Sequence, residues 1–260
     1  MTAGLAVVTG ASAGIGWEMA RQLAARGYDL LAIARREERL AKLAQQVSSE
    51  SSRKVECMRL DLAVPEERRK LVSALYSAAE RLSLVVNNAG FGIAGPTVQS
   101  PFERIARLIE LDITALTELS YEAAKIMIKK KSGALINVAS TAAFQPVPYM
   151  NAYSAAKAYV LSFTEALAEE LSEHGIRVMA LCPGYTKTEF QAVAGVVRDD
   201  VRFRSVMSAA DCVRTGLEDF DNGKRISITG TGNKLMVFGS WLAPRRLVIK
   251  AAAKMMRDRA

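Results

Sequence analysis

The stretch of sequence that decides the fold lies near the N-terminus, where residues 5–16 read LAVVTGASAGIG. The apolar run Leu5–Thr9 is typical of a short buried strand, and the pattern from Gly14 to Arg26 predicts a helix that Gly27 ends. Glycines between the two permit a tight turn, a close approach of the backbone to a pyrophosphate, and close packing of helix on strand. The start of the helix also offers unpaired N–H groups to phosphate. The stretch therefore predicts a dinucleotide-binding turn; the alternative is a tight turn without a ligand.

The rest of the chain alternates short apolar runs with longer helical patterns. Seven strands are predicted, at Leu5–Thr9, Tyr28–Ala34, Val55–Leu60, Leu84–Asn87, Ala134–Ala139, Arg177–Cys182 and Arg225–Thr229. Helical patterns separate them, among them Glu37–Ser48, Phe102–Lys130 and Ala152–His174. This alternation indicates βαβ crossovers, and uniformly apolar strands fit a sheet that is covered on both faces. We therefore expect a single α/β domain of the Rossmann type, a doubly wound parallel sheet of about seven strands with helices on both faces.

Composition and charge narrow the functional classes. The chain has 260 residues, 50% of them hydrophobic and 24% charged, which indicates a globular protein and excludes a disordered one. No uncharged apolar run approaches the roughly 18 residues of a membrane span. Three scattered cysteines predict free buried thiols instead of a disulfide framework or a metal site. Residues 234–260 carry +6 of the net charge of +8, so no nucleic-acid surface is expected. The N-terminal residues lack the pattern of a signal peptide, and we expect a cytoplasmic protein.

Five short motifs follow one another at the predicted strand ends. They are TGxxxGxG at residues 9–16, NNAG at 87–90, Ser140, YSAAK at 153–157, and PG at 183–184 with Thr186 and Thr188 after it. Each motif is weak alone, but together and in this order they resemble the short-chain dehydrogenase/reductase family from Gly4 to about Gly232. The resemblance, which is to a bacterial branch of NADP-dependent ketone reductases, implies an oxidoreductase. Such an enzyme transfers a hydride between a nicotinamide cofactor and a carbonyl or alcohol substrate.

The resemblance also implies which residues contact the cofactor. They are Gly10, Ser12, Ala13, Gly14, Ile15, Gly16, Arg35, Arg36, Asp61, Leu62, Asn88, Ala89, Gly90, Tyr153, Lys157, Pro183, Gly184 and Thr186. Within this set Asp61 and Leu62 match the family's adenine contacts, and Lys157 matches its contact to the nicotinamide ribose. No metal ligand is implied.

The end of the second predicted strand bears on which nicotinamide cofactor is used. An acid at this position would bind the ribose 2′-hydroxyl of NAD and repel a 2′-phosphate. The sequence instead reads Ile33-Ala34-Arg35-Arg36, and guanidinium groups bind a phosphate through paired charge-assisted hydrogen bonds. Many NADPH-using relatives also carry a basic residue within the glycine turn, where this chain has Ala13. We expect NADP(H) to be preferred over NAD(H); the alternative is that both arginines only begin a solvated helix.

Tyr153 and Lys157 are the candidates for the chemistry. They lie four residues apart in a helical pattern, so their side chains share one face. A phenol with a pKa near 10 is a poor acid–base group at neutral pH, and a nearby ammonium favours the phenolate and lowers that pKa. By the resemblance, Tyr153 exchanges a proton with the substrate oxygen, Ser140 holds that oxygen, and Lys157 assists.

Asp112 is the clearest departure from the family pattern. The family usually carries an asparagine here, in a sequence such as LNxxG, whereas this chain reads Leu111-Asp112-Ile113-Thr114-Ala115. The family's asparagine holds a water near the lysine and completes a proton relay. Aspartate keeps the acceptor oxygens, loses the donor and adds a charge beside Lys157, so the relay either works or is impaired. Asp112 is counted with the candidate catalytic residues.

The chain is expected to consist of a catalytic domain and a short basic tail. We expect residues 1–240 to form the catalytic domain, with an irregular substrate-covering segment at about 185–208 and an apolar pocket near residues 144–149 and Phe190. Residues 241–260 predict a basic amphipathic helix, with Arg246, Lys250, Lys254 and Arg257 along one face. Packing of its apolar side on the domain or a partner subunit is favoured over peripheral contact with an anionic membrane.

Two functional classes remain open at this point. An oxidoreductase that acts on a small carbonyl or alcohol is favoured, because Ser140, Tyr153 and Lys157 are all present. The rival is a non-catalytic NADP-binding regulatory protein of the same fold, which only Asp112 favours. The absence of a GxSxG motif argues against a hydrolase. By the resemblance, a homodimer or homotetramer that pairs the two long helices is expected.

Overall fold

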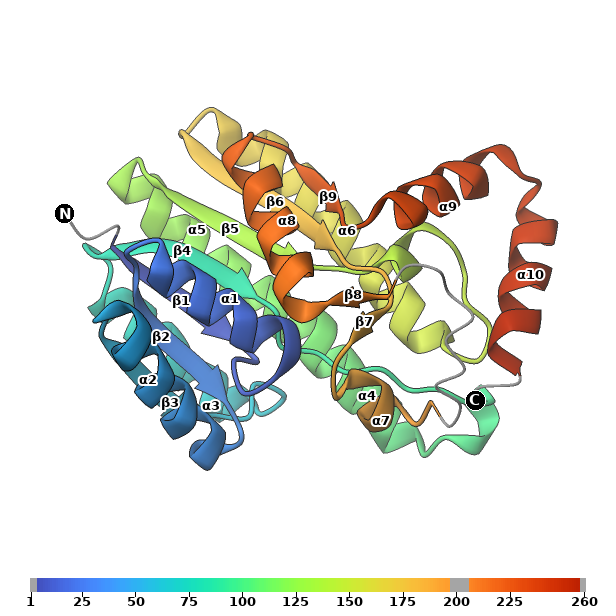
Figure 1. The fold of residues 1–260 in the computed structure, drawn as a ribbon, viewed down its shortest axis with the longest axis horizontal. Helices are drawn as coiled ribbons and strands as arrows, with labels where there is room; N and C mark the ends of the chain where they lie inside the picture. The colour runs from blue at the N-terminus through green and yellow to red at the C-terminus, as the bar shows by residue number, and fades with distance from the viewer. Residues whose placement is uncertain (1–3, 197–205, 258–260) are drawn as a thin grey trace.

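Seven strands form the central sheet of the computed structural model, which describes residues 4–196 and 206–257. The strands are β1 (Leu5–Thr9), β2 (Asp29–Ala34), β3 (Val55–Arg59), β4 (Leu82–Asn87), β5 (Gly133–Val138), β6 (Ile176–Cys182) and β9 (Ile226–Ile228). They lie parallel in the order β3-β2-β1-β4-β5-β6-β9 (Figure 1). The predicted fold class and all seven predicted strands are confirmed, with ends that differ by one or two residues.

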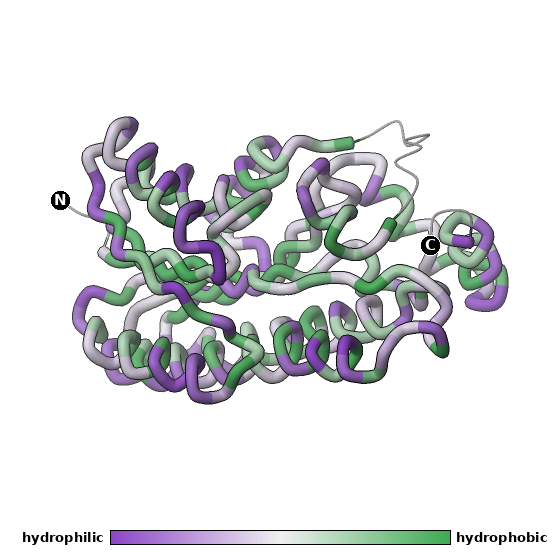
Figure 2. The backbone as a smooth tube through the Cα atoms, turned by 90° about the horizontal axis from the view of Figure 1, so that it is seen from below, coloured by the Kyte–Doolittle hydropathy of each residue, from purple (hydrophilic) through white to green (hydrophobic). Residues whose placement is uncertain are grey.

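Helices cover both faces of this sheet. One face carries α1 (Gly14–Ala25), α2 (Glu37–Ser51) and α8 (Ala209–Asp221), and the other carries α3 (Pro65–Ser77), α5 (Leu116–Lys130) and α6 (Asn151–Ser172). Alternate residues of β1 serve the two faces, because Ala6 and Val8 join one apolar cluster and Leu5 and Val7 join the other. Figure 2 shows the hydrophobic strands between helices whose outer sides are hydrophilic. Burial on both faces explains why inner strands such as β1 read as apolar runs, whereas the edge strand β3 is largely exposed.

The stretch predicted as one helix, Phe102–Lys130, is helical throughout but not uniform. After α4 (Phe102–Ile109) comes a π-helical turn, Glu110–Ala115, and only then α5. Such π turns are rare and occur frequently at functional sites. Here the turn contains Asp112, whose side chain is fully buried.

The predicted substrate-covering segment contains short elements that the sequence did not predict. β7 (Thr186–Lys187) pairs in parallel with β8 (Met207–Ser208), and α7 (Phe190–Ala194) lies between them in the chain. Residues 197–205 of this segment lie outside the described residues. The two-residue strands bring Tyr185 close to the start of α8, since the Met207 N–H donates to the Tyr185 carbonyl at 3.4 Å.

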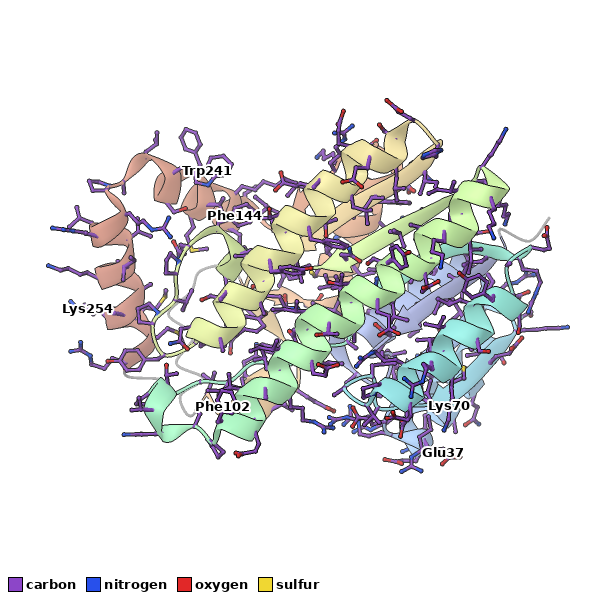
Figure 3. The ribbon with its side chains drawn as sticks, turned by 180° about the vertical axis from the view of Figure 1, so that it is seen from behind. Glu37, Lys70, Phe102, Phe144, Trp241 and Lys254 are labelled. Atoms are coloured by element: carbon purple, nitrogen blue, oxygen red, sulfur yellow. The ribbon has the colours of Figure 1, made fainter. Side chains whose placement is uncertain are left out.

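The last two helices form an arm at one end of the molecule (Figure 1). They are α9 (Thr231–Leu242) and α10 (Arg245–Arg257). On α10, Ala252 and Met256 are buried while Arg246, Lys250 and Lys254 are exposed, so its apolar side packs on the molecule. Figure 3 shows Lys254 extending outward from the arm and Trp241 near Phe144, whose ring centroid is 6.1 Å away. No helix of the described residues is both long and apolar enough to cross a membrane.

Within the predicted basic tail, residues 241–260, the helix α10 begins at Arg245, directly after Pro244, whose carbonyl accepts the N–H of Leu247 at 2.8 Å. Trp241 and Leu242 belong to α9. One local expectation differs from the structure. Cys182 and Cys212 are buried as expected, but Cys57 is exposed, since β3 is an edge strand of the sheet.

The order of the strands fixes where a ligand can bind. From β1 the chain builds the sheet outward through β2 and β3, and then returns to build the other side from β4. In sheets of this kind the crevice lies beyond the carboxyl ends of the strands at that reversal. Here the reversal falls between β1 and β4, so the glycine turn after β1 faces residues 87–90 after β4.

Close packing of the glycine turn gives a test of this geometry. A Cβ on Gly16 would lie 2.3 Å from the Gly10 carbonyl oxygen and 2.4 Å from Asn88 Nδ2. We expect Gly16→Ala to lower the free energy of unfolding by about 1–3 kcal/mol, because the backbone of the turn must shift. Urea unfolding monitored by circular dichroism measures this.

Gly239→Ala is the matched control. Gly239 lies within α9, and no atom of another described element is within 4 Å of an added Cβ. Alanine should stabilise the helix there by about 0.5–1 kcal/mol. Equal effects of the two substitutions would contradict the close contact at Gly16.

Candidate active site

A cleft of about 730 Å³ opens at the carboxyl ends of the strands. Every residue predicted to contact a cofactor lines it except Gly16, namely Gly10, Ser12, Ala13, Gly14, Ile15, Arg35, Arg36, Asp61, Leu62, Asn88, Ala89, Gly90, Tyr153, Lys157, Pro183, Gly184 and Thr186. Of the predicted catalytic residues, Ser140, Tyr153 and Lys157 line the cleft, while Asp112 is not among the lining residues. Gly16 instead packs against Gly10 and Asn88 beneath the turn.

The glycine turn presents backbone to the cleft and leaves the start of α1 without a cap. Gly10 and Gly14 have positive φ angles of 68° and 55°, which favour glycine. Ala13 is the N-cap residue of α1, and its side chain makes no capping hydrogen bond to the first N–H groups of the helix. Such N–H groups form a binding site for an anion such as a pyrophosphate.

Asn88 and Thr9 hold this turn against the end of β4. Asn88 Nδ2 donates to the Thr9 carbonyl at 2.9 Å and to the Gly10 carbonyl at 3.3 Å. In return, Thr9 Oγ1 accepts from the N–H groups of Asn88 and Ala89 at 2.9 and 3.0 Å. The NNAG motif therefore positions the turn, and Thr9 is a positioning residue that the sequence analysis did not assign.

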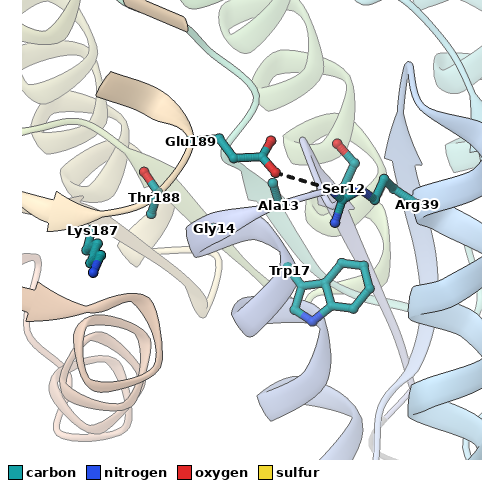
Figure 4. A pocket seen from close by; sticks show the side chains of 8 residues that line it. All are labelled: Ser12, Ala13, Gly14, Trp17, Arg39, Lys187, Thr188 and Glu189. Atoms are coloured by element: carbon teal, nitrogen blue, oxygen red, sulfur yellow. Dashed lines mark hydrogen bonds and ion pairs between the residues drawn. The ribbon is translucent and has the colours of Figure 1, made fainter. Parts of the chain in front are cut away.

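Arginines and acids share the part of the cleft beyond β2 and β3. Arg35 is exposed, and Arg36 hydrogen-bonds Ser12 and forms an ion pair with Glu189. The carboxylate of Asp61 pairs with Arg107 and also accepts the N–H of Ala63 at 3.1 Å. Figure 4 shows Glu189 facing Arg39 across an adjoining pocket, with their ion pair drawn as a dashed line. The positive charge that the sequence predicted here is thus partly neutralised.

Ser140, Tyr153 and Lys157 come together farther along the sheet. Ser140 follows β5 and caps a short 3₁₀ turn, where its Oγ accepts the N–H of Ala142 at 3.1 Å. Tyr153 and Lys157 lie in the first two turns of α6, and the Lys157 Nζ atom is 5.7 Å from the centroid of the Tyr153 ring. Phe190 of α7 contacts the other side of the active site, with its ring centroid 5.2 Å from that of Tyr153.

Burial dominates the electrostatics of Tyr153, whose exposed fraction is 8%. Loss of hydration raises the pKa of the phenol, while the Lys157 charge and a hydrogen bond with Ser140 act in the opposite direction without overcoming it. The effect predicted for Lys157 is therefore present, but the net pKa shift of the tyrosine is upward. Tyr153 is protonated at neutral pH and can act as an acid.

Asp112 forms a buried ion pair with Lys157. Asp112 Oδ2 is 3.1 Å from Lys157 Nζ, and the side chains are 0% and 5% exposed. The other oxygen, Oδ1, accepts the N–H of Phe91 at 3.1 Å, and Lys157 Nζ donates to the Val138 carbonyl at 3.0 Å. Burial alone lowers the pKa of Lys157, but the Asp112 carboxylate and the Tyr153 phenol outweigh it and raise that pKa. The ammonium is therefore kept charged beside Tyr153.

The cleft also contains residues that the sequence analysis missed. They are Met236 of α9, Met255 and Met256 of α10, and Met150, which directly precedes α6. Val147, from the expected apolar pocket, also lines the cleft. Phe190 lines it as expected, but Phe144 does not; it packs on Trp241 instead. Only the apolar side of the amphipathic tail was a signal for the methionines, and it did not indicate which surface they would cover.

Comparisons with known proteins agree with this geometry. A family model described as short chain dehydrogenase matches residues 4–196. An uncharacterized oxidoreductase of Myxococcus xanthus is 34% identical over 187 residues, which are 72% of this chain and 74% of that protein. A short-chain dehydrogenase from Sphingobium yanoikuyae, solved in complex with NADPH, is 35% identical with a TM-score of 0.83 and covers 92% of this chain and 94% of its own. A bulky-bulky ketone specific alcohol dehydrogenase from Comamonas testosteroni is 28% identical with a TM-score of 0.79 and covers 92% of each chain.

The Asp112–Lys157 pair leads to a prediction about pH dependence. Asp112→Asn keeps an acceptor for the Phe91 N–H but removes a charge that raises the pKa of both Lys157 and Tyr153. The pKa of Tyr153 should fall, so a reaction that needs the protonated phenol should lose rate at a lower pH than in the parent. We expect this shift of the alkaline limb to exceed any change in the maximal rate, as measured by profiles of kcat/KM against pH.

Glu110→Gln serves as the control, because Glu110 lies in the same π turn but pairs with Arg68 at 2.7 Å. Its profile should match that of the parent. Superimposable profiles for all three proteins would show that Asp112 does not influence the proton transfer.

Proposed function

The chain belongs to the short-chain dehydrogenase family, and on that premise we propose that it is an NADP(H)-dependent oxidoreductase for carbonyl and alcohol substrates. The observation that carries this proposal is the convergence of Ser140, Tyr153 and Lys157 in the cleft that Arg35 and Arg36 also line. The two groups occupy different ends of the cleft, because β1 and β4 separate β2 from β5 in the sheet. A dinucleotide that runs across the strand ends would therefore place its two halves against them.

The residues around the cleft suit a nicotinamide dinucleotide. The uncapped start of α1 and the glycine turn suit the pyrophosphate, and the backbone around Asp61 and Leu62 suits the adenine. Lys157 Nζ donates to the Val138 carbonyl and forms an ion pair with Asp112, and its remaining donor capacity suits the nicotinamide ribose. When bound, the cofactor supplies or accepts the hydride.

The chain's own residues handle the substrate oxygen and its proton. In the direction of reduction, the Tyr153 hydroxyl donates its proton to that oxygen, and the Ser140 hydroxyl donates a hydrogen bond that holds it in place. The ammonium of Lys157 stabilises the phenolate that remains. In the direction of oxidation, the same phenolate takes the proton back from the alcohol. Burial raises the pKa of Tyr153, so at neutral pH the phenol carries the proton that reduction requires.

The substrate proposed for this site is a carbonyl compound with apolar substituents. Val147, Met150 and Phe190 surround the reactive end, and Met255 and Met256 add a wall from the C-terminal arm. Methionine side chains adapt to irregular apolar shapes, so this wall suits several substrates of similar size. The similarity to a ketone-specific alcohol dehydrogenase of Comamonas testosteroni supports a ketone.

Preference for NADP(H) is the part of the proposal that rests on Arg35 and Arg36. Both line the cleft after β2, and no acid occupies the position that would bind the ribose hydroxyls of NAD. The similarity to a Sphingobium yanoikuyae enzyme solved with NADPH supports this choice.

Removal of one hydroxyl tests the role of Tyr153. Tyr153→Phe should lower kcat by about 10²–10⁴-fold, since only the proton donor is lost, and should leave NADPH binding unchanged. NADPH oxidation with a panel of ketones, aldehydes and 3-oxoacyl thioesters measures kcat, and fluorescence titration measures binding.

Tyr159→Phe removes a hydroxyl from the same helix and is the control. Within the described residues, the only hydrogen bond of the Tyr159 hydroxyl is to Thr117 Oγ1, at 3.0 Å. This control should keep the parent rate. If Tyr153→Phe retains more than about a tenth of that rate, Tyr153 is not the general acid. A parent protein that binds NADPH but turns over none of the panel would favour the non-catalytic alternative.

The cofactor preference predicts unequal binding of NADPH and NADH. The parent should bind NADPH more tightly than NADH. Arg35→Ala should weaken the binding of NADPH by about 1.5–3 kcal/mol, the value of a hydrogen bond to a charged group, and should leave the binding of NADH unchanged. Calorimetric dissociation constants check this, with Arg69→Ala as the control because Arg69 is exposed and lies outside the cleft. Equal affinities of the parent for the two cofactors would overturn the assignment.

A further inference from the structure

Glu189 places a carboxylate where the proposed cofactor site needs positive charge. It follows β7 and immediately precedes α7, on the segment that covers the cleft. Its Oε2 atom lies 2.7 Å from Arg36 Nη1, and its Oε1 atom lies 3.5 Å from Arg39 Nη2. Glu189 itself lines both the main cleft and the adjoining pocket of about 440 Å³ shown in Figure 4. Glu189 therefore pairs with two arginines, Arg39 in α2 and Arg36 directly before that helix.

The other two nitrogens of Arg36 are also engaged. Its Nε and Nη2 atoms donate to Ser12 Oγ at 3.3 and 3.1 Å, and Nη2 approaches the Ser12 carbonyl at 3.4 Å. The guanidinium thus joins the glycine turn on one side to the covering segment on the other. Arg35 differs, because it is exposed and forms no ion pair within residues 4–196 and 206–257. Of the two arginines expected to bind a phosphate, only Arg35 is free of a carboxylate in the described part of the chain.

A 2′-phosphate that binds Arg36 must therefore compete with Glu189. The phosphate and the carboxylate would both accept hydrogen bonds from the same guanidinium, and their negative charges repel each other. A cofactor without the 2′-phosphate would leave the Glu189–Arg36 pair undisturbed. We propose that Glu189 is a specificity-determining residue that weakens the binding of 2′-phosphorylated cofactors by competing for Arg36, and so narrows the preference for NADP(H) over NAD(H). This inference rests on the proposed function, since it concerns the same cofactor site.

The size of the effect follows from the exposure of the pair. The side chains of Arg36 and Glu189 are 40% and 45% exposed, and ion pairs at such positions are screened by water and salt. The competition should therefore change affinity by about three- to five-fold, and less at high salt. Other contacts hold the segment in place, because Arg104 Nη2 donates to the Val193 carbonyl and the Ala94 N–H to the Ala194 carbonyl, both at 2.8 Å. Loss of the Glu189 contact should thus leave the segment folded.

Two nucleotides that differ mainly in the 2′-phosphate test the proposal without turnover. Titration calorimetry would measure the dissociation constants of adenosine 2′,5′-bisphosphate and adenosine 5′-monophosphate for the parent, Glu189→Gln and Glu38→Gln. Glu38 is the matched control, because it is an exposed acid near the start of α2 that does not line the cleft. We expect Glu189→Gln to bind the bisphosphate about three- to five-fold more tightly and the monophosphate unchanged, with no change for Glu38→Gln.

An Arg36→Ala background identifies the partner. The gain from Glu189→Gln should disappear there, since the two residues act through one contact. Equal tightening of both nucleotides would overturn the proposal, and so would weaker binding of the bisphosphate, which would make the Glu189–Arg36 pair a clasp over the ligand. If the parent binds neither nucleotide, the proposed cofactor site is wrong and this inference fails with it. If the parent binds the bisphosphate and Glu189→Gln changes nothing, only the inference is wrong.

Discussion

The buried ammonium of Lys157 is the constraint on which the candidate active site depends. A charge with so little exposure must be paired, and it is paired with Asp112 and with the Val138 carbonyl at the end of β5. Loss of one partner of a buried pair typically costs about 3–5 kcal/mol, because the other charge is left without compensation. Asp112 reaches this position through the π turn that interrupts the long helix. The same carboxylate explains Gly90, where a Cβ would lie 2.8 Å from Asp112 Oδ2.

A second polar network supports the site from within the sheet. Asn87 at the end of β4 donates to Asn137 Oδ1 on β5 at 2.9 Å and to Ser120 Oγ on α5 at 3.0 Å. Asn137 in turn donates to Thr164 Oγ1 on α6 at 3.0 Å. All four side chains are buried, so these bonds join two strands to the helices packed on them. These bonds thereby fix α6, which carries Tyr153 and Lys157, relative to the ends of β4 and β5.

The two ends of the cleft are built by different means. At the end near β2, Arg36 and Arg39 form ion pairs with Glu189 of the covering segment. These side chains are exposed, which keeps each contact weak. At the end near β5, Tyr153, Phe190 and several methionines line the cleft, and burial raises the pKa of the phenol. The contacts among charged side chains at the first end are therefore sensitive to salt, whereas the pKa of Tyr153 at the second end depends on packing.

The sequence by itself determined the fold class, the strand positions and the set of residues at the strand ends. Apolar runs alternate with helical patterns, and in a parallel sheet the carboxyl ends of all strands meet at one edge, so TGxxxGxG, NNAG, Ser140 and YSAAK had to converge. Tertiary structure alone decided what those residues contact. The resemblance placed Asp112 beside Lys157, but helical spacing does not reveal a π turn, so the full burial of this pair and its contacts with Phe91 and Val138 were decided by the tertiary structure. Nor could local pattern show that Glu189 reaches Arg36 or that the methionines of α10 line the cleft, because these contacts join segments far apart in the chain, and their geometry exists only once the intervening elements have packed.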